Sequence, residues 1–104
     1  MDLKKIKKLN RKNKILWSAH VEKRMMEREI SRRDVRECIK NGEIIEDYPT
    51  DYPYPSCLIY GKIRNMKVVL HVVPSVNDED SLVIITAYFP NEQTFEADLK
   101  TRRK

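Results

Sequence analysis

The sequence predicts one α+β domain, in which N-terminal helices pack on a four-stranded antiparallel sheet. Before Gly42 the hydrophobic residues recur at steps of three and four, as in helices, and after it they alternate, as in strands. Helices and strands that are segregated along a chain favour this class. A chain of 104 residues can bury one core without disulfides or metals. We expect residues 1–16 to form a basic arm or a weak helix, residues 17–99 the domain, and residues 100–104 a basic tail.

Two helices are indicated in the first thirty residues. The segment "DLKKIKKLNRKNK" has apolar residues at helical spacing among seven Lys and Arg residues, so it is either a weakly amphipathic helix or a disordered arm. A second helix is expected to begin after Ser18 as its N-cap and to end near Arg28–Glu29. Its apolar row consists of Trp17, Val21 and Met25.

The third helix has the clearest start in the chain. Ser31 is the expected N-cap, and Asp34 takes the third helical position of a capping box. Ile30 and Val35 have the spacing of a hydrophobic staple. We expect the helix to end at "NG", with Gly42 in the left-handed conformation that such a stop favours.

Four strands are expected after this helix, in "EIIEDY", "CLIYGKIR", "KVVLHVV" and "LVIITAYF". Asn65–Met66 is the expected hairpin turn, and the final "NEQTFEADLKTRRK" is expected to form at most a short helical turn and otherwise to fray. Alternation puts His71 on the opposite face from Leu70 and Val72. The last strand would divide into two faces. The purely apolar face would hold Val83, Ile85, Ala87 and Phe89, and the other face would hold Leu82, Ile84, Thr86 and Tyr88.

Charge is distributed unevenly along the chain, whose net charge is +5. Residues 1–40 carry 14 Lys and Arg against 6 Asp and Glu, whereas residues 41–99 carry 3 against 10. A segregated positive field attracts phosphate backbones, although it is also compatible with a merely solubilising basic arm. No apolar run is long enough for a membrane span, and Cys38 and Cys57 indicate reduced thiols in a cytoplasmic protein.

A polar and mostly cationic row, His20, Arg24 and Arg28, borders the apolar row of the second helix. Arginine suits phosphate because its planar guanidinium donates two parallel hydrogen bonds, although these arginines could equally form surface ion pairs. The simplest strand pairing puts the other histidine, His71, near Thr86 and Tyr88. Two histidines, arginines and hydroxyls are the groups needed to cleave RNA without metal. The two histidines must then share a cleft, which helices on only one sheet face would prevent.

Other chemistries have little support. The chain has no P-loop, GxGxxG, HExxH or GxSxG motif. The spacing of the histidines and cysteines does not support a zinc site. We therefore expect neither a metal nor a cofactor.

In order and spacing, "HVEKRMMEREISRRDVRECIKNGEIIEDY", "PYPSCLIYG", "LHVV" and "IITAYFP" resemble the domain-of-unknown-function family 4258, which comprises small prokaryotic proteins and toxin modules. The resemblance covers residues 18–90. It implies the barnase–EndoU–colicin–RelE fold group, in which helices pack on a four-stranded antiparallel sheet and RNA is cleaved without metal. It also implies functional roles for the helix and strand residues His20, Arg24, Arg28, His71, Thr86 and Tyr88.

We therefore expect a metal-independent endoribonuclease, the toxin of a toxin–antitoxin pair, that cleaves RNA by 2′-OH attack to give a 2′,3′-cyclic phosphate. Its partners would be RNA, including ribosome-bound RNA, and an antitoxin protein. A non-catalytic nucleic-acid-binding module is the main alternative. Its contacts would come from the arm and the tail: Lys4, Lys5, Lys7, Lys8, Arg11, Lys12, Lys14, Arg102, Arg103 and Lys104. A protein-interaction domain that uses the Tyr/Pro-rich loop 48–55 is the third possibility.

Overall fold

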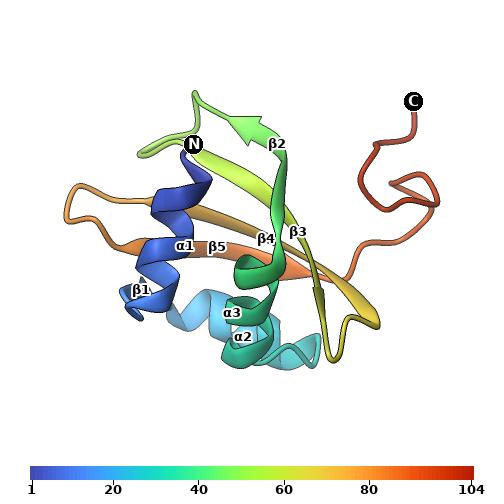
Figure 1. Cartoon of the computed structure of the whole chain (residues 1–104), viewed down its shortest axis with the longest axis horizontal. Coiled ribbons are helices and arrows are strands. Elements are labelled where there is room, and N and C mark those ends of the chain that lie inside the picture. The colour runs from blue at the N-terminus through green and yellow to red at the C-terminus, as the bar shows by residue number, and fades with distance from the viewer.

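The computed structural model describes residues 1–104 and confirms the α+β class. Three helices cover one face of a single sheet, and the C-terminal segment lies on the other side (Figure 1). The helices are α1 (Leu3–Arg11), α2 (Ala19–Glu27) and α3 (Arg32–Asn41). None of the three has the length and apolar character that crossing a membrane would require.

The sheet has five strands in the order β1-β5-β4-β3-β2, rather than the four that we predicted. Strands β2 to β5 pair antiparallel, as expected, whereas β1 runs parallel to β5 and makes the sheet mixed. A strand as short as β1 shows no alternation, so the sequence does not reveal it. The strands are β1 (Ile15–Leu16), β2 (Glu43–Tyr48), β3 (Ser56–Ile63), β4 (Val68–Val76) and β5 (Leu82–Tyr88).

The helices begin where their capping residues predict. The Ser18 hydroxyl accepts a hydrogen bond from the Val21 amide at 3.1 Å. Ser31 and Asp34 form the predicted capping box, in which each side chain accepts from the other residue's amide at 3.0 Å. The N-terminal segment, expected as an arm or a weak helix, is a helix capped by Asp2.

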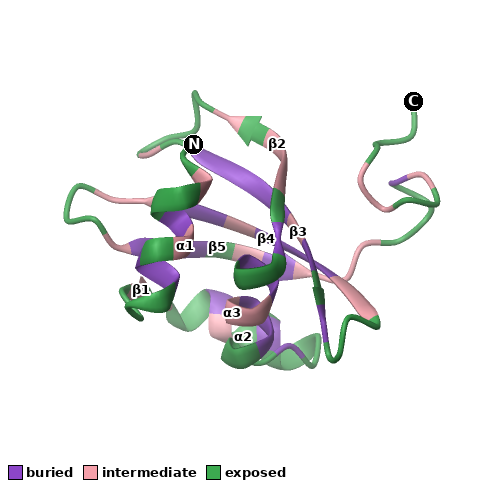
Figure 2. Cartoon of the chain, in the orientation of Figure 1, coloured by how far each residue is buried: buried purple, intermediate pink, exposed green.

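The core lies between the helices and the sheet face that they cover (Figure 2). Helix α1 contributes to it, because Ile6 and Leu9 are buried against its other members. Both cysteines are free thiols buried within it, and burial raises the pKa of Cys38 to about 12 and that of Cys57 to about 11. Both thiols are therefore protonated near neutral pH and unreactive.

The only two glycines are needed for a close approach of α3 to the sheet. Gly42 is extended (φ −94°, ψ 172°), so the prediction of a left-handed helix stop was wrong. It leads straight into β2, and an added Cβ would lie 2.5 Å from the Cys38 carbonyl oxygen. An added Cβ at Gly61 would lie 2.2 Å from the same oxygen. Glycine is therefore required at both positions for lack of space.

The predicted division of β5 into two faces was also wrong. Val73 pairs with Thr86 and Pro74 with Ile84, so Ile85 is an additional residue in β5 that forms a β-bulge. The bulge puts Leu82 and Ile84 on the helix-covered face together with Ala87 and Phe89. Thr86 and Tyr88 therefore face away from the helices. The predicted faces of β4 were correct, because Leu70 and Val72 join the core and His71 points to the other side.

Candidate functional site on the helix-free face of the sheet

Three aromatic side chains form a row across the face of the sheet that no helix covers. His71 in β4 pairs with Tyr60 in β3 and with Tyr88 in β5. The centroid of the His71 ring lies 6.1 Å from that of Tyr60 and 5.3 Å from that of Tyr88. Residues opposite each other in neighbouring strands lie on the same face. The predicted proximity of His71 to Tyr88 is therefore confirmed.

A second β-bulge adds a carboxylate to this face. In β2, Ile44 pairs with Ile59 and Glu46 with Leu58, which leaves Ile45 as an additional residue. Glu46 is thereby turned away from the core. Its carboxylate accepts hydrogen bonds from the Tyr48 hydroxyl at 2.5 Å and from Arg102 Nε at 2.8 Å. We call the set Glu46, Tyr48, Tyr60, His71, Tyr88 and Arg102 the sheet-face cluster.

His71 is completely buried, and both of its ring nitrogens have partners. Nε2 lies 2.7 Å from the Leu99 carbonyl oxygen, which can only accept, so Nε2 carries a proton. Nδ1 lies 3.3 Å from the Tyr88 hydroxyl and accepts from it when the ring is neutral. Burial lowers the pKa of His71, although the Leu99 carbonyl and the charge of Glu46 oppose that shift. The neutral imidazole is therefore the favoured form.

The other groups of the cluster have shifted pKa values as well. Burial alone would raise the pKa of Glu46, but the hydrogen bonds from Tyr48 and Arg102 outweigh it, and the pKa is lowered. Burial and the neighbouring Glu46 raise the pKa of Tyr48 to about 12. Burial also raises the pKa of Tyr88. Glu46 is therefore charged and both tyrosines are neutral near pH 7.

The C-terminal segment, residues 91–104, folds over the cluster. Phe95 is buried with its ring centroid 4.7 Å from that of His71. Lys100 pairs with Glu43 at 2.8 Å and lies over the Tyr60 ring. This segment was expected to fray, and instead it packs on the sheet through one buried aromatic ring and ion pairs.

One residue of the predicted cationic row reaches the helix-free face. Arg28, the C-cap of α2, donates through Nη1 to the Thr86 hydroxyl at 3.3 Å and to the Ala87 carbonyl at 2.9 Å. Strand β1 covers only the start of β5, so this part of β5 is an open sheet edge. Arg28 therefore connects the helix layer to the face that holds His71.

The structure does not bring the rest of the row to the cluster. His20 and Arg24 are exposed on α2, and no hydrogen bond or ion pair involves either side chain. Helix α2 packs against the covered face of the sheet, because Val21 and Met25 belong to the core. His20 thus lies on the helix side, whereas His71 is buried on the other side. The two histidines do not share a cleft.

The basic residues of the arm and the tail separate into paired and unpaired groups. Arg102 and Arg103 pair at 2.8 Å with Glu46 and Glu96, and Lys5 pairs at 2.6 Å with Asp80. Lys104 is exposed. A hollow over α1 and the β4–β5 loop is lined mainly by arm lysines: Lys4, Lys5, Lys8, Lys12 and Lys14, with Asp2, Leu9 and Asp80. The remaining two, Lys7 and Arg11, face α3.

The loop 48–55, the contact surface of the third predicted function, contains three tyrosines. Tyr52 is 95% exposed, whereas Tyr48 belongs to the cluster and the Tyr54 hydroxyl donates to Asp78 at 3.4 Å. The loop therefore presents one free tyrosine. No three His, Cys, Asp or Glu side chains gather where they could hold a metal ion.

Sequence reasoning missed Glu46, Tyr48 and Tyr60 as members of the site, and placed Arg102 in a free tail. Strict alternation in "EIIEDY" puts Glu46 and Tyr48 on the same face as Ile44, which packs against the core. Only the bulge at Ile45 moves them to the other face, and nothing in the residues around it signals a bulge. The cluster opens beside Tyr88 into a hollow of about 260 Å³, which Phe95 and Arg102 also line.

Comparison with known proteins places the chain by its sequence. No curated protein and no solved structure matches it. One family model matches residues 17–89, from the residue before the α2 N-cap to the residue after β5, and so includes His71, Thr86 and Tyr88 but not the C-terminal segment. The chain belongs to the family described as a domain of unknown function (DUF4258).

Proposed function

We propose that the protein is a metal-independent endoribonuclease whose chemistry takes place at the sheet-face cluster. The observation that carries the proposal is the hydrogen bond between His71 Nδ1 and the Tyr88 hydroxyl, beside Arg102. A neutral imidazole coupled to a partly exposed hydroxyl can accept a proton near neutral pH. The arginine supplies a fixed positive charge where a phosphate would sit.

In the proposed reaction, the Tyr88 oxygen takes the proton of a ribose 2′-OH while its own proton passes to His71 Nδ1. The 2′-oxygen attacks phosphorus, the bond to the 5′-oxygen breaks, and the leaving oxygen takes a proton from water. The hydroxide so formed takes the additional proton back from His71 through Tyr88, which restores the neutral imidazole. The products are a 2′,3′-cyclic phosphate and a 5′-OH end. Arg102, positioned by Glu46, and Arg28, positioned by Thr86, oppose the additional negative charge of the transition state.

The proposed mechanism differs from the one predicted from the sequence in two respects. His20 takes no part, because it lies on the helix side of the sheet. Residues 91–99 also cover the cluster through Phe95 and Leu99, so turnover requires this part of the segment to move away from His71 while Arg102 stays paired with Glu46. Leu99, whose carbonyl binds His71, has a left-handed backbone (φ 59°) that disfavours a leucine. That local cost lowers the energy needed to detach the segment.

The test is cleavage of RNA by the purified full-length protein in EDTA. Three substrates cover the possibilities: a structured RNA, an unstructured RNA and mRNA bound to ribosomes. We expect products with 2′,3′-cyclic phosphate ends, identified by mass spectrometry. Tyr88→Phe removes only the hydroxyl and should lower kcat by about 100-fold or more. His20→Ala should leave the rate unchanged.

Two results would overturn the proposal. The first is no cleavage of any of the three substrates, in which case RNA binding without cleavage would support the alternative of a binding module. The second is cleavage at the parent rate by Tyr88→Phe and by Glu46→Gln. A melting curve for each variant shows whether a lost activity reflects a lost fold.

The toxin role and an antitoxin partner are part of the same proposal. Induced expression of the parent protein in bacteria should arrest growth, and expression of Tyr88→Phe at the same level should not. Equal growth arrest by both proteins would show that toxicity does not depend on the proposed reaction.

A further inference from the structure

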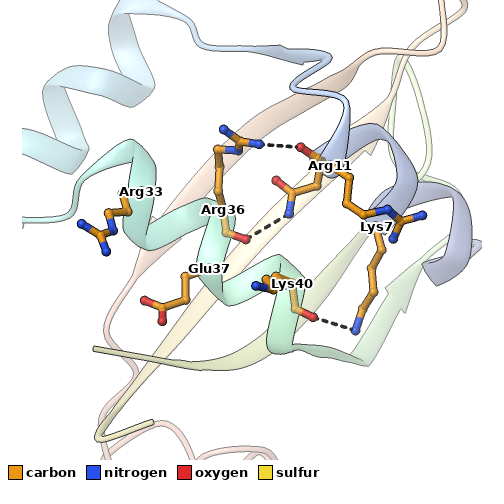
Figure 3. A pocket seen from close by; sticks show the side chains of 7 residues that line it. Lys7, Arg11, Arg33, Arg36, Glu37 and Lys40 are labelled. Carbon is orange, nitrogen blue, oxygen red and sulfur yellow. Dashed lines mark hydrogen bonds between the residues drawn. The ribbon is translucent and has the colours of Figure 1, made fainter. Parts of the chain in front are cut away.

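A second surface with strong positive charge lies on the opposite side of the molecule from the sheet-face cluster. Helices α1 and α3 border a cleft with a volume of about 760 Å³ (Figure 3). None of its seven lining residues is hydrophobic, and five are cationic. The lining residues are Lys7, Asn10, Arg11, Arg33, Arg36, Glu37 and Lys40, and we call this surface the α1–α3 cleft.

Three cations of the cleft have no acidic partner. No ion pair or hydrogen bond involves the side-chain nitrogens of Arg11, Arg33 or Lys40. The one carboxylate of the cleft, that of Glu37, accepts instead from the Arg64 amide at 3.1 Å. Several cations outside the cleft are paired with carboxylates, as in Arg32 with Glu22. Cations that line one hollow repel each other, and an anion that enters the hollow relieves this repulsion.

Arg36 is held in place at the centre of the cleft. Its Nη2 donates to the Asn10 carbonyl at 2.9 Å, and the Asn10 side-chain amide donates to the Arg36 carbonyl at 3.0 Å (Figure 3). Asn10 is only 4% exposed, so this reciprocal pair is fixed. Arg36 Nε and Asn10 Oδ1 are both buried without a hydrogen-bond partner. A buried guanidinium donor without an acceptor is costly, and an oxygen atom that reached Arg36 Nε would remove that cost.

The surface continues into a smaller hollow that shares Arg33 and Arg36 and also contains Trp17 and Arg32. Trp17 is the only tryptophan of the chain, and the Arg32 guanidinium lies 5.1 Å from the centre of its ring. A surface with several arginines and one aromatic ring suits a phosphodiester backbone with a neighbouring base. A protein partner would instead require an apolar centre, which the cleft does not have.

We infer that the α1–α3 cleft binds the phosphate backbone of RNA at a position separate from the sheet-face cluster. The inference rests on the proposed function, because it makes RNA the ligand. Since the helices and the cluster lie on opposite sides of the sheet, one RNA molecule must pass around the domain to touch both surfaces. The substrate class is therefore long or structured RNA, for which the cleft adds affinity that a very short oligonucleotide does not gain.

The experiment measures binding independently of cleavage. The probe is a labelled 20-nucleotide 2′-O-methyl RNA, which keeps the phosphate backbone but lacks the reacting 2′-hydroxyl. Fluorescence anisotropy gives the Kd, and quenching of Trp17 reports occupation of the adjoining hollow. A DNA probe of the same sequence shows whether the backbone alone suffices.

The test variant is Arg11→Gln/Arg33→Gln, which removes one exposed, unpaired cation from each helix. The matched control is Lys23→Gln/Lys67→Gln, which removes two exposed cations outside the cleft. The cleft variant should bind at least tenfold more weakly, and its slope of log Kd against log salt should fall by about 1.4, at about 0.7 per lost phosphate contact. The control should bind within threefold of the parent.

Equal losses in the two variants, or none in either, would overturn the inference. So would displacement of the RNA by poly-L-glutamate as effectively as by unlabelled RNA, because the cleft would then fit an acidic protein. Failure of the proposed function appears differently. The protein would bind the probe through the cleft but cleave no natural RNA. Conversely, if the protein cleaves RNA and the cleft variant binds the probe as tightly as the parent, only the inference about the α1–α3 cleft is overturned.

Discussion

The Nε2 nitrogen of His71 lies 2.7 Å from the carbonyl oxygen of Leu99, a residue 28 positions further along the chain. Through this bond a strand histidine and the C-terminal segment fix each other. The segment excludes water from His71, and His71 donates a hydrogen bond to the Leu99 carbonyl, which would otherwise have no partner. The first two predictions concern this relationship.

Phe95→Ala should loosen the C-terminal segment and admit water to His71. Removing a buried aromatic ring typically costs about 3 kcal/mol of unfolding free energy, and the cost is smaller if only the segment detaches. The pKa of His71 should rise towards its ordinary value, as followed by an NMR titration of the ring protons. Tyr52→Ala, at a 95% exposed position, is the control and should change neither quantity. An unchanged His71 titration in Phe95→Ala would show that Phe95 does not control its burial.

The buried neutral His71 should make stability depend on pH. Its pKa is lowered in the folded state from an ordinary value of 6.5, so the unfolded chain binds the additional proton. The stabilisation is therefore complete above about pH 6.5 and is lost as the pH falls towards the folded-state pKa, by at most about 1.4 kcal/mol per pH unit.

Urea unfolding between about pH 5 and 8 measures this dependence while carboxylates with lowered pKa values stay ionised. His71→Gln should flatten the curve, and His20→Gln, which removes the exposed histidine, should not. A curve of parental shape for His71→Gln would assign the dependence to other groups.

Arg28→Ala should lower the unfolding free energy by about 1 kcal/mol, because the Ala87 carbonyl at the open edge of β5 loses its donor. Arg24→Ala, one helical turn earlier, removes the same side chain from an exposed position without a hydrogen bond and is the matched control. Urea unfolding of both variants checks this prediction. Equal stabilities would mean that water replaces the arginine at no cost.

Gly61→Ala should lower the unfolding free energy by about 3 kcal/mol or more, since the added methyl group would overlap the Cys38 carbonyl. Thermal unfolding would measure the loss. Because the clash is with backbone, adding Cys38→Ala should not restore stability. Rescue by this second substitution would show that the Cys38 side chain, and not the main chain, limits the space.

Much of the fold could be predicted because it depends on short-range signals. The caps of α2 and α3 are local hydrogen bonds formed by Ser18, Ser31 and Asp34, so a few residues suffice to recognise them. The alternation in β4 is equally local, and it placed His71 correctly. Strand β1 could not be predicted, because its two residues form a strand only through pairing with β5.

The candidate site was less predictable because its geometry depends on long-range contacts. Burial of His71 requires Phe95 and Leu99, which lie in a stretch without helical or strand periodicity. The separation of His20 from His71 depends on which sheet face α2 covers, and the sequence left that open. The cleft likewise depends on Asn10 and Arg36 meeting between two helices.

The bulges at Ile45 and Ile85 make the site sensitive to the number of residues in two strands. Deleting either isoleucine would turn the residues on one side of it to the opposite face, because successive side chains in a strand alternate. Such a deletion would direct Glu46 and Tyr48, or Thr86 and Tyr88, into the space of the core. We expect insertions and deletions among related chains to fall in residues 49–55 and 77–81, and to be rare within β2 and β5, even where individual side chains there are exchanged.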